Sequence, residues 1–184
     1  MAAFGISPLE NDGRLFMSGE VDRMPEPPAA RHVPVLLREV ERILDLRPGL
    51  IVVDGTVGAG GHAKMIASRI GSEGTLIGLD RDPMMLALAA QVLPASNNII
   101  LKQASYVELP DVLKGLGLSG VDRVLLDLGL SSDQLADASR GFSFLAEGPL
   151  DLRFDKSRGQ SAAEFLRTAS ESELERVQIG RAHV

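Results

Sequence analysis

The stretch LIVVDGTVGAGGHAK, residues 50–64, decides how the rest of the chain folds. It opens with a continuous apolar run rich in β-branched residues, which is typical of a parallel strand covered on both faces. Gly58, Gly60 and Gly61 follow in a turn, and a helical stretch begins at His62. Glycines in such a turn let a ligand approach the backbone, whose amide groups then donate to its polar atoms. The alternative interpretation is a tight turn between strand and helix that binds nothing.

Strand-like and helix-like segments alternate along the chain around this turn. The strand-like runs are 50–54, 75–80, 98–102 and 121–129, and helical patterns cover 35–46, 62–70, 82–93 and, in broken form, 105–118. Regular alternation predicts an α/β fold with a parallel, doubly wound sheet. In such a sheet the ligand crevice lies outside the carboxyl ends of the strands.

The composition is that of one soluble globular domain. Of 184 residues, 45% are hydrophobic and 24% are charged. There is no cysteine, which excludes disulfides, thiolate metal sites and a cysteine nucleophile and fits the cytoplasmic location that we expect. No apolar stretch reaches the roughly 18 residues of a membrane helix, so we expect no membrane partner. The three histidines are isolated from one another, which argues against a metal site.

We expect three segments along the chain. Residues 1–31 carry glycine, proline and charges without periodicity and are interpreted as a flexible N-terminal arm. Residues 32–135 contain the four predicted strands and form the cofactor-binding core. Residues 136–184 begin as a long loop and continue as the start of a helical substrate-recognition part, where Ser161 and Glu164 stand at capping-box spacing.

An acid after the second predicted strand indicates the class of ligand. Asp80 stands 22 residues after Gly58, at a position where a carboxylate accepts hydrogen bonds from ribose hydroxyls. The stretch GAGGHA (58–63) also fits the looser G-x-G-x-x-A form of a dinucleotide fingerprint, so NAD stays open at this point. Asp54, which ends the first strand, tolerates a positively charged cofactor better than a pyrophosphate. With Thr56 and the glycines it resembles the first motif of S-adenosylmethionine-dependent methyltransferases.

Polar residues also follow the fourth predicted strand. Asp127 lies where the strand ends meet, so its carboxylate either orients a cofactor or a substrate amine or caps a helix or turn. Ser131 and Ser132 either cap the next segment or donate hydrogen bonds to a substrate. His62 either contacts a cofactor through its ring or packs and bonds to the backbone.

Several stretches together resemble one family, the RsmH (MraW) family of small-subunit ribosomal RNA cytosine-N4 methyltransferases. The matching pieces occur in order: HVPVLLREV (32–40), DGTVGAGGHAK (54–64), GLDRDP (78–83), LLDLGLSSDQL (125–135), RGFSF (140–144) and GPLDLRFDKSRGQSAAEFL (148–166). The resemblance implies a Rossmann-like methyltransferase fold with S-adenosyl-L-methionine as cofactor. The implied partner is small-subunit ribosomal RNA, free or in the assembled subunit, and the implied product is an N4-methylated cytidine in its decoding region.

The resemblance also implies site residues. The family's cofactor contacts fall on Gly60, Gly61, His62, Asp80, Tyr106, Asp127 and Gln134. Tyr106 stands where the family often has phenylalanine, and either ring is suited to cover an adenine. The exocyclic nitrogen of cytosine is a poor nucleophile, so a catalytic role for Asp127 is to accept a hydrogen bond from this amine. The alternative is that Asp127 contacts the cofactor only.

Contacts to RNA are expected between residues 140 and 158. Arg140, Arg153 and Arg158 lie in this segment, and the net charge of -6 means that binding to nucleic acid has to come from such local groups. Nearby acids balance these arginines. The alternative is therefore a solvated or internally paired loop.

The chain departs from the family near its end. Four strands are predicted, whereas the methyltransferase fold normally has seven, and the final IGRAHV (179–184) does not resemble the family's continuation. We therefore expect a chain truncated at its C-terminus, whose fourth strand leaves an edge open to self-association. An NAD-dependent oxidoreductase and a non-catalytic nucleotide-binding fragment are the alternative functions, which ligand choice and methyl transfer to RNA would separate.

Overall fold

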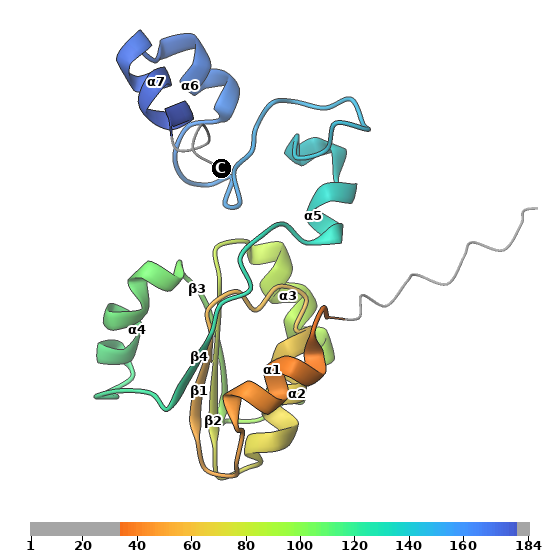
Figure 1. The fold of residues 1–184 in the computed structure, drawn as a ribbon, viewed down its shortest axis with the longest axis vertical. Helices are drawn as coiled ribbons and strands as arrows, with labels where there is room; N and C mark the ends of the chain where they lie inside the picture. Colours follow the sequence, from red (N-terminus) through yellow and green to blue (C-terminus); the bar gives the residue numbers. More distant parts are fainter. Residues whose placement is uncertain (1–33, 180–184) are drawn as a thin grey trace, which may run out of the picture. The chain divides into compact units, whose positions relative to one another are not determined.

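A four-stranded parallel sheet lies at the centre of this computed structural model, which describes residues 34–179 (Figure 1). The strands are β1 (Ile51–Asp54), β2 (Thr75–Asp80), β3 (Ile99–Gln103) and β4 (Arg123–Leu125), in the spatial order β3-β2-β1-β4. The predicted arm at 1–31 lies outside the described residues. The parallel sheet predicted from the alternating pattern is confirmed.

Helices cover both faces of the sheet. The helices α1 (Leu37–Leu44), α2 (Gly61–Ile70) and α3 (Pro83–Val92) pack on one face, and α4 (Leu109–Gly115) packs on the other (Figure 1). The side chains of successive strand residues point to opposite faces. Val52 therefore joins the core under α2 and α3, whereas Val53 joins the core under α4. The doubly wound arrangement is thus confirmed as well.

The direction of winding reverses between β1 and β4. The chain runs from β1 through α2 to β2 and through α3 to β3, and then returns through α4 to the other side of β1. In β1, Val53 partners Ile77 of β2 and Val124 of β4. Such a reversal opens a crevice at the carboxyl ends of the two strands that flank it. Asp54 ends β1 at this place.

Two of the elements that are shorter than predicted are shortened by an identifiable contact or backbone conformation. β4 spans Arg123–Leu125 instead of 121–129, because the N–H of Asp127 donates to Thr56 Oγ1 (2.7 Å) and not to a neighbouring strand. Helix α1 begins at Leu37, two residues later than predicted, because Leu36 has a left-handed φ of 58°. A side-chain contact from a distant part of the chain thus limits β4, whereas the backbone conformation of Leu36 sets the start of α1.

The segment after β4 contains more regular structure than predicted. It holds the short helix α5 (Ser132–Ala136) and the 3₁₀ turn η2 (Ala138–Arg140), followed by α6 (Ala162–Thr168) and α7 (Glu171–Ile179). The predicted cap at the start of α6 is confirmed, since Ser161 Oγ accepts the N–H of Glu164 (3.2 Å). Within residues 34–179, no helix is both long and apolar enough to cross a membrane.

Candidate functional site

The three glycines of the turn have different local reasons to be glycine. Gly58 has a φ of 52°, and a Cβ built there would meet nothing closer than 3.8 Å. At Gly60, with a φ of 88°, a Cβ would lie 2.8 Å from Val92 Cγ2, and at Gly61 it would overlap the ring of Pro34. Packing against α3 and Pro34 therefore explains Gly60 and Gly61. Gly58 alone leaves open space on its Cα for a ligand to approach.

Asp80 is tied directly to this turn. Its Oδ2 accepts the N–H of Gly58 (3.0 Å), and its Oδ1 accepts the N–H of Asp82 (2.9 Å). Burial raises the pKa of the half-buried Asp80 carboxyl, and these backbone N–H groups oppose that effect. Each oxygen keeps a further lone pair. The spacing of 22 residues seen in the sequence thus becomes a direct contact between acid and turn.

Asp54 is the most deeply buried acid of the crevice. Its side chain is 1% exposed, Oδ1 accepts the N–H of Thr56 (3.2 Å), and Oδ2 has no hydrogen-bond partner among the described residues. Burial raises the pKa of Asp54 to about 7, and repulsion from Asp80 and Asp127 adds to the rise. Three carboxyl groups close to one another favour a positively charged ligand over a negatively charged one.

Asp127 and His62 meet at the edge of the crevice. The Asp127 side chain is 63% exposed, and its Oδ2 lies 3.8 Å from Nδ1 of His62. The ring of His62 is buried, and its Nε2 lies 3.2 Å from the carbonyl oxygen of Val35. His62 therefore packs and bonds to the backbone, as one interpretation expected, while its second nitrogen faces Asp127.

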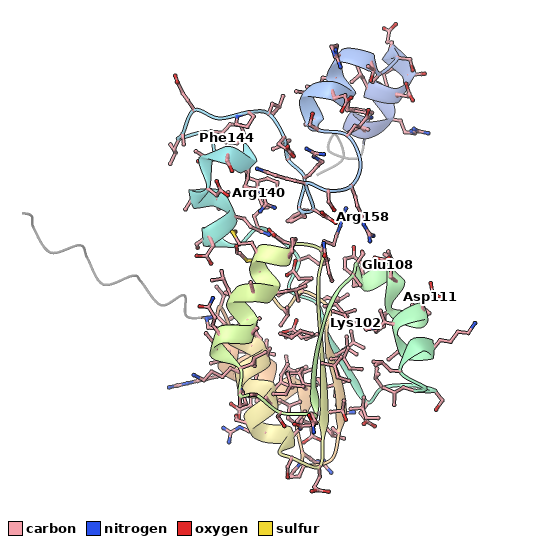
Figure 2. All side chains as sticks on the ribbon, turned by 180° about the vertical axis from the view of Figure 1, so that it is seen from behind. Lys102, Glu108, Asp111, Arg140, Phe144 and Arg158 are labelled. Atoms are coloured by element: carbon pink, nitrogen blue, oxygen red, sulfur yellow. The ribbon has the colours of Figure 1, made fainter. Side chains whose placement is uncertain are left out.

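A cleft of about 600 Å³ lies beyond the carboxyl end of β3. It is lined by Arg81, by residues 103–108, which include the 3₁₀ turn η1 (Tyr106–Glu108), and by residues 152–155 and Arg158. Tyr106 is 41% exposed, so its ring is accessible. Figure 2 shows Glu108 and Arg158, which belong to different segments of the cleft lining. Tyr106, predicted to cover an adenine, thus lies in a cleft of suitable size for a ligand.

The residues that follow β4 form a cap for α5. Ser131 Oγ accepts the N–H of Gln134 (3.1 Å), and Gln134 Oε1 accepts the N–H of Ser131 (3.0 Å), which is a capping box. Gln134 is buried, and its Nε2 donates to Asp82 Oδ2 (2.9 Å). Ser132 is exposed. Of the two serines, Ser131 therefore takes the capping role that was one of the two interpretations.

The three arginines proposed for RNA differ in their surroundings. Arg140 is buried and pairs with Asp82 (2.8 Å), whereas Arg158 is 75% exposed and lies 3.6 Å from Asp155. Arg153 donates from Nε and Nη2 to the two oxygens of Asp151 (2.8 Å each) and from Nη1 to the carbonyl of Gly159 (3.0 Å). These hydrogen bonds lower the pKa of Asp151 to about 2. Much of the charge in this segment is paired within it.

The sequence pattern predicts only part of the role of Asp82 at this site. Asp82 precedes Pro83, and an Asp-Pro pair at the start of a helical pattern indicates a cap, which Asp82 indeed provides to Met84 (3.0 Å). The pattern does not show that the same carboxylate is 1% exposed and also binds Gln134 and Arg140. These partners are distant in sequence.

Comparisons with known proteins identify related sequences. A sequence model of the MraW methylase family matches residues 29–180. The ribosomal RNA small subunit methyltransferase H of Methylobacillus flagellatus is 44% identical over 161 residues, which are 88% of this chain and 50% of that protein. Its counterpart from Nitrosospira multiformis is 47% identical over 149 residues, or 81% and 46%. The chain spans about half the length of the curated relatives it matches.

Among solved structures, Aeropyrum pernix fibrillarin in complex with natively bound S-adenosyl-L-methionine matches part of this chain. It shares 21% sequence identity with this chain, with a TM-score of 0.40 over 52% of this chain and 40% of that one.

Proposed function

The chain belongs to the MraW methylase family, and from this premise we propose that it binds S-adenosyl-L-methionine at the carboxyl ends of β1, β2 and β3. We further propose that it serves the N4-methylation of a cytidine in the decoding region of small-subunit ribosomal RNA. The observation that carries the proposal is the joining of the glycine turn to Asp80 through the bond from Gly58 N–H (3.0 Å).

The residues around the crevice fit a cofactor that carries both a nucleoside and a positive charge. Asp80 is placed to accept hydrogen bonds from ribose hydroxyls, and Tyr106 lines a cleft that suits an adenine. The exposed Asp127 adds negative charge beside the turn, and the buried Asp54, whose Oδ2 lacks a partner among residues 34–179, has its pKa raised to about 7, so that a nearby positive charge would favour its ionised form. When bound, S-adenosyl-L-methionine supplies an activated methyl group on a sulfonium.

The same charges weigh against NAD. A dinucleotide would bring two phosphates to the glycine turn, close to Asp54, Asp80 and Asp127, whose carboxyl groups already repel one another. The neighbouring Arg140 is held in a buried pair with Asp82 and is not free to neutralise a pyrophosphate. An oxidoreductase is therefore the less favoured reading.

In the chemistry that we propose, Asp127 works at the amine of the target cytidine. Its carboxylate is 63% exposed, so a substrate can reach it, and its backbone is fixed by the bond to Thr56 Oγ1 (2.7 Å). Accepting a hydrogen bond there would orient the amine toward the methyl group. The base has to leave its stack to enter such a site. The exposed Ser132 and Arg158 are then the residues best placed to meet RNA, ahead of Ser131, Arg140 and Arg153.

Transfer of labelled methyl groups from S-adenosyl-L-methionine tests this function. We expect label in ribosomal RNA when purified small subunits, or their naked RNA, are supplied, and an Asp127→Asn change to slow transfer by about 100-fold. Asp133→Asn is the matched control, because Asp133 is an exposed acid in the same segment after β4, on the helix α5 that follows Asp127.

Two results would change the conclusion. Full transfer by Asp127→Asn would remove the catalytic role of Asp127 and leave it as a cofactor contact. A chain that binds S-adenosyl-L-methionine but labels neither RNA nor subunits would favour the non-catalytic fragment. Comparing naked RNA with subunits also shows whether the substrate is free or assembled RNA.

A further inference from the structure

A buried ion pair joins the core to the segment after β4. Arg140 Nη2 lies 2.8 Å from Asp82 Oδ2, and the two side chains are 6% and 1% exposed. Removing two charges from water is costly, and their mutual attraction compensates only when further hydrogen bonds complete the arrangement. The stability of this pair therefore depends on the other hydrogen bonds that Asp82 and Arg140 make.

On the core side, Asp82 is connected to the predicted cofactor site. Its N–H donates to Asp80 Oδ1 (2.9 Å), and Asp80 Oδ2 in turn accepts the N–H of Gly58 (3.0 Å). Its own carboxylate accepts from Met84 N–H (3.0 Å) and from Gln134 Nε2 (2.9 Å). Asp82 thus has one bond to the acid of the glycine turn and several that fix its own carboxylate.

On the other side, Arg140 holds one wall of the cleft. Nη2 of Arg140 also donates to the carbonyl oxygens of Arg153 (3.0 Å) and Phe154 (2.8 Å), and its own carbonyl accepts the N–H of Leu152 (3.0 Å). These three residues line the cleft that Tyr106 also lines. We call residues 152–155 the cleft wall.

Two other contacts attach the cleft wall to the core, each through an exposed residue of the core. Gln103 Nε2 donates to Asp155 Oδ2 (3.0 Å), and the guanidinium of Arg81 lies 5.7 Å from the centroid of the Phe154 ring. Exposed hydrogen bonds and cation-π contacts compete with water and contribute little. The buried pair is therefore the attachment with the greatest effect on the position of the wall.

We propose that Asp82 and Arg140 are positioning residues for the cofactor: their buried ion pair holds the cleft wall beside Tyr106 and links it to Asp80 and the glycine turn. Gln134 belongs to the same cluster through its bond to Asp82. The identity of the ligand in this inference rests on the proposed function. The attachment of the cleft wall by the ion pair does not depend on it. Figure 2 shows Arg140, from which this connection starts.

The only tyrosine of the chain makes the attachment measurable without any ligand. The protein has one tyrosine and no tryptophan, so tyrosine fluorescence reports Tyr106 alone. Arg140→Lys keeps the positive charge, but the lysine ammonium ends one bond short of Nη2, the atom that contacts Asp82 and both carbonyl oxygens, so it cannot make all three contacts. We expect acrylamide quenching of Tyr106 to increase at least twofold in Arg140→Lys and in Asp82→Asn.

The matched control is Arg123→Lys. Arg123 also donates to backbone carbonyls, those of Leu44 (2.6 Å) and Asp122 (2.8 Å), but at the start of β4, where it lines no part of the cleft. We expect acrylamide to quench Tyr106 in Arg123→Lys to the same extent as in the wild type. Quenching in folded Arg140→Lys that equals the wild type would overturn the proposal.

Titration with S-adenosyl-L-methionine gives the second readout. In samples shown to be folded by circular dichroism, we expect its Kd to rise at least tenfold in Arg140→Lys and Asp82→Asn and to stay unchanged in Arg123→Lys. An unchanged Kd in a folded Arg140→Lys variant would reduce the pair to a structural role and overturn the proposal. If the wild type bound no S-adenosyl-L-methionine, the proposed function would fail. The quenching of Tyr106 would still show whether the ion pair holds the cleft wall.

A further variant decides the question if both changes prevent folding. Gln103→Leu removes the exposed attachment at Asp155 and leaves the buried pair in place. We expect ligand-free quenching of Tyr106 in Gln103→Leu to stay within about 20% of the wild type, since exposed hydrogen bonds contribute little. A twofold increase would show that the exposed attachment holds the wall, and the proposal would be wrong.

Discussion

At the scale of single residues, Asp54 combines deep burial with an incomplete set of hydrogen bonds. Its Oδ1 accepts one backbone N–H, whereas Oδ2 has no partner among the residues that the structure describes. Burial raises its pKa from 3.8 to about 7. A carboxyl group with such a pKa stays protonated in the folded protein over a range in which the unfolded chain has already released the proton.

This difference makes stability depend on pH in a defined direction. Below pH 4 both states hold the Asp54 proton, and between about pH 4 and pH 7 only the folded state does. The free energy of unfolding therefore falls by up to about 4 kcal/mol in total as pH rises through this window. Above the window it levels off. We expect Asp54→Asn, which is isosteric and does not titrate, to lack this component.

Urea unfolding at several values between pH 4 and pH 8 measures the effect. Subtracting the Asp54→Asn curve from that of the wild type removes the contributions of the other acids, such as Asp80 and Asp151, which both proteins share. If the free energies of unfolding of the wild type and Asp54→Asn changed in parallel with pH across this window, Asp54 would not titrate there.

At the scale of elements, the open edge of β4 leads to a prediction about association. Among the described residues β4 pairs with β1 alone, and Val124, Leu126 and Leu128 on and after it are 45%, 44% and 65% exposed. An edge strand with exposed apolar side chains is a template for pairing with another chain. We expect the protein to self-associate with rising concentration and Val124→Lys to weaken this association at least tenfold.

Sedimentation velocity over a range of concentrations measures this association. Val177→Lys is the control, because Val177 is a similarly exposed valine (61%) on α7, away from the sheet. A wild type that stays monomeric throughout, or a Val124→Lys protein that associates as strongly, would refute the role of this edge.

The elements show what the sequence could and could not predict. β2 spans Thr75–Asp80, as its unbroken apolar run indicates, because a strand covered on both faces leaves a clear local pattern. The predicted end of β4 was wrong, because the strand's true end depends on a hydrogen bond between Asp127 N–H and Thr56 Oγ1, and these residues lie 71 positions apart in the sequence. Helix α5 was missed, because five residues carry too little periodicity for any pattern to show.

The candidate site divides in the same way. Gly58 and Asp80 were paired from their spacing in the sequence, and the structure joins them directly. Gly60 was read as a position for ligand approach, yet the nearest atoms to its missing Cβ belong to Val92 and Ala89 of α3. Sequence spacing therefore locates a strand-to-helix turn well, but it does not separate glycines that face a ligand from glycines that face another helix.

At the scale of the whole molecule, acidic groups gather where the strands end. The chain carries a formal net charge of -6, and Asp54, Asp80 and Asp127 lie close enough to affect one another at the carboxyl ends of the sheet. Such an edge suits a cationic cofactor, while contact with a polyanion has to come from elsewhere. We therefore propose that the cofactor binds at the strand ends and that RNA contacts the segment that carries Arg158.

Calorimetric titration of the 184-residue chain with S-adenosyl-L-methionine and, in parallel, with NAD tests the cofactor site most directly, once the sample has been shown to be folded and monodisperse. We expect saturable binding of S-adenosyl-L-methionine and no measurable binding of NAD. Binding of NAD, or a folded chain that binds neither, would contradict the assignment of the glycine turn and Asp80 to this cofactor.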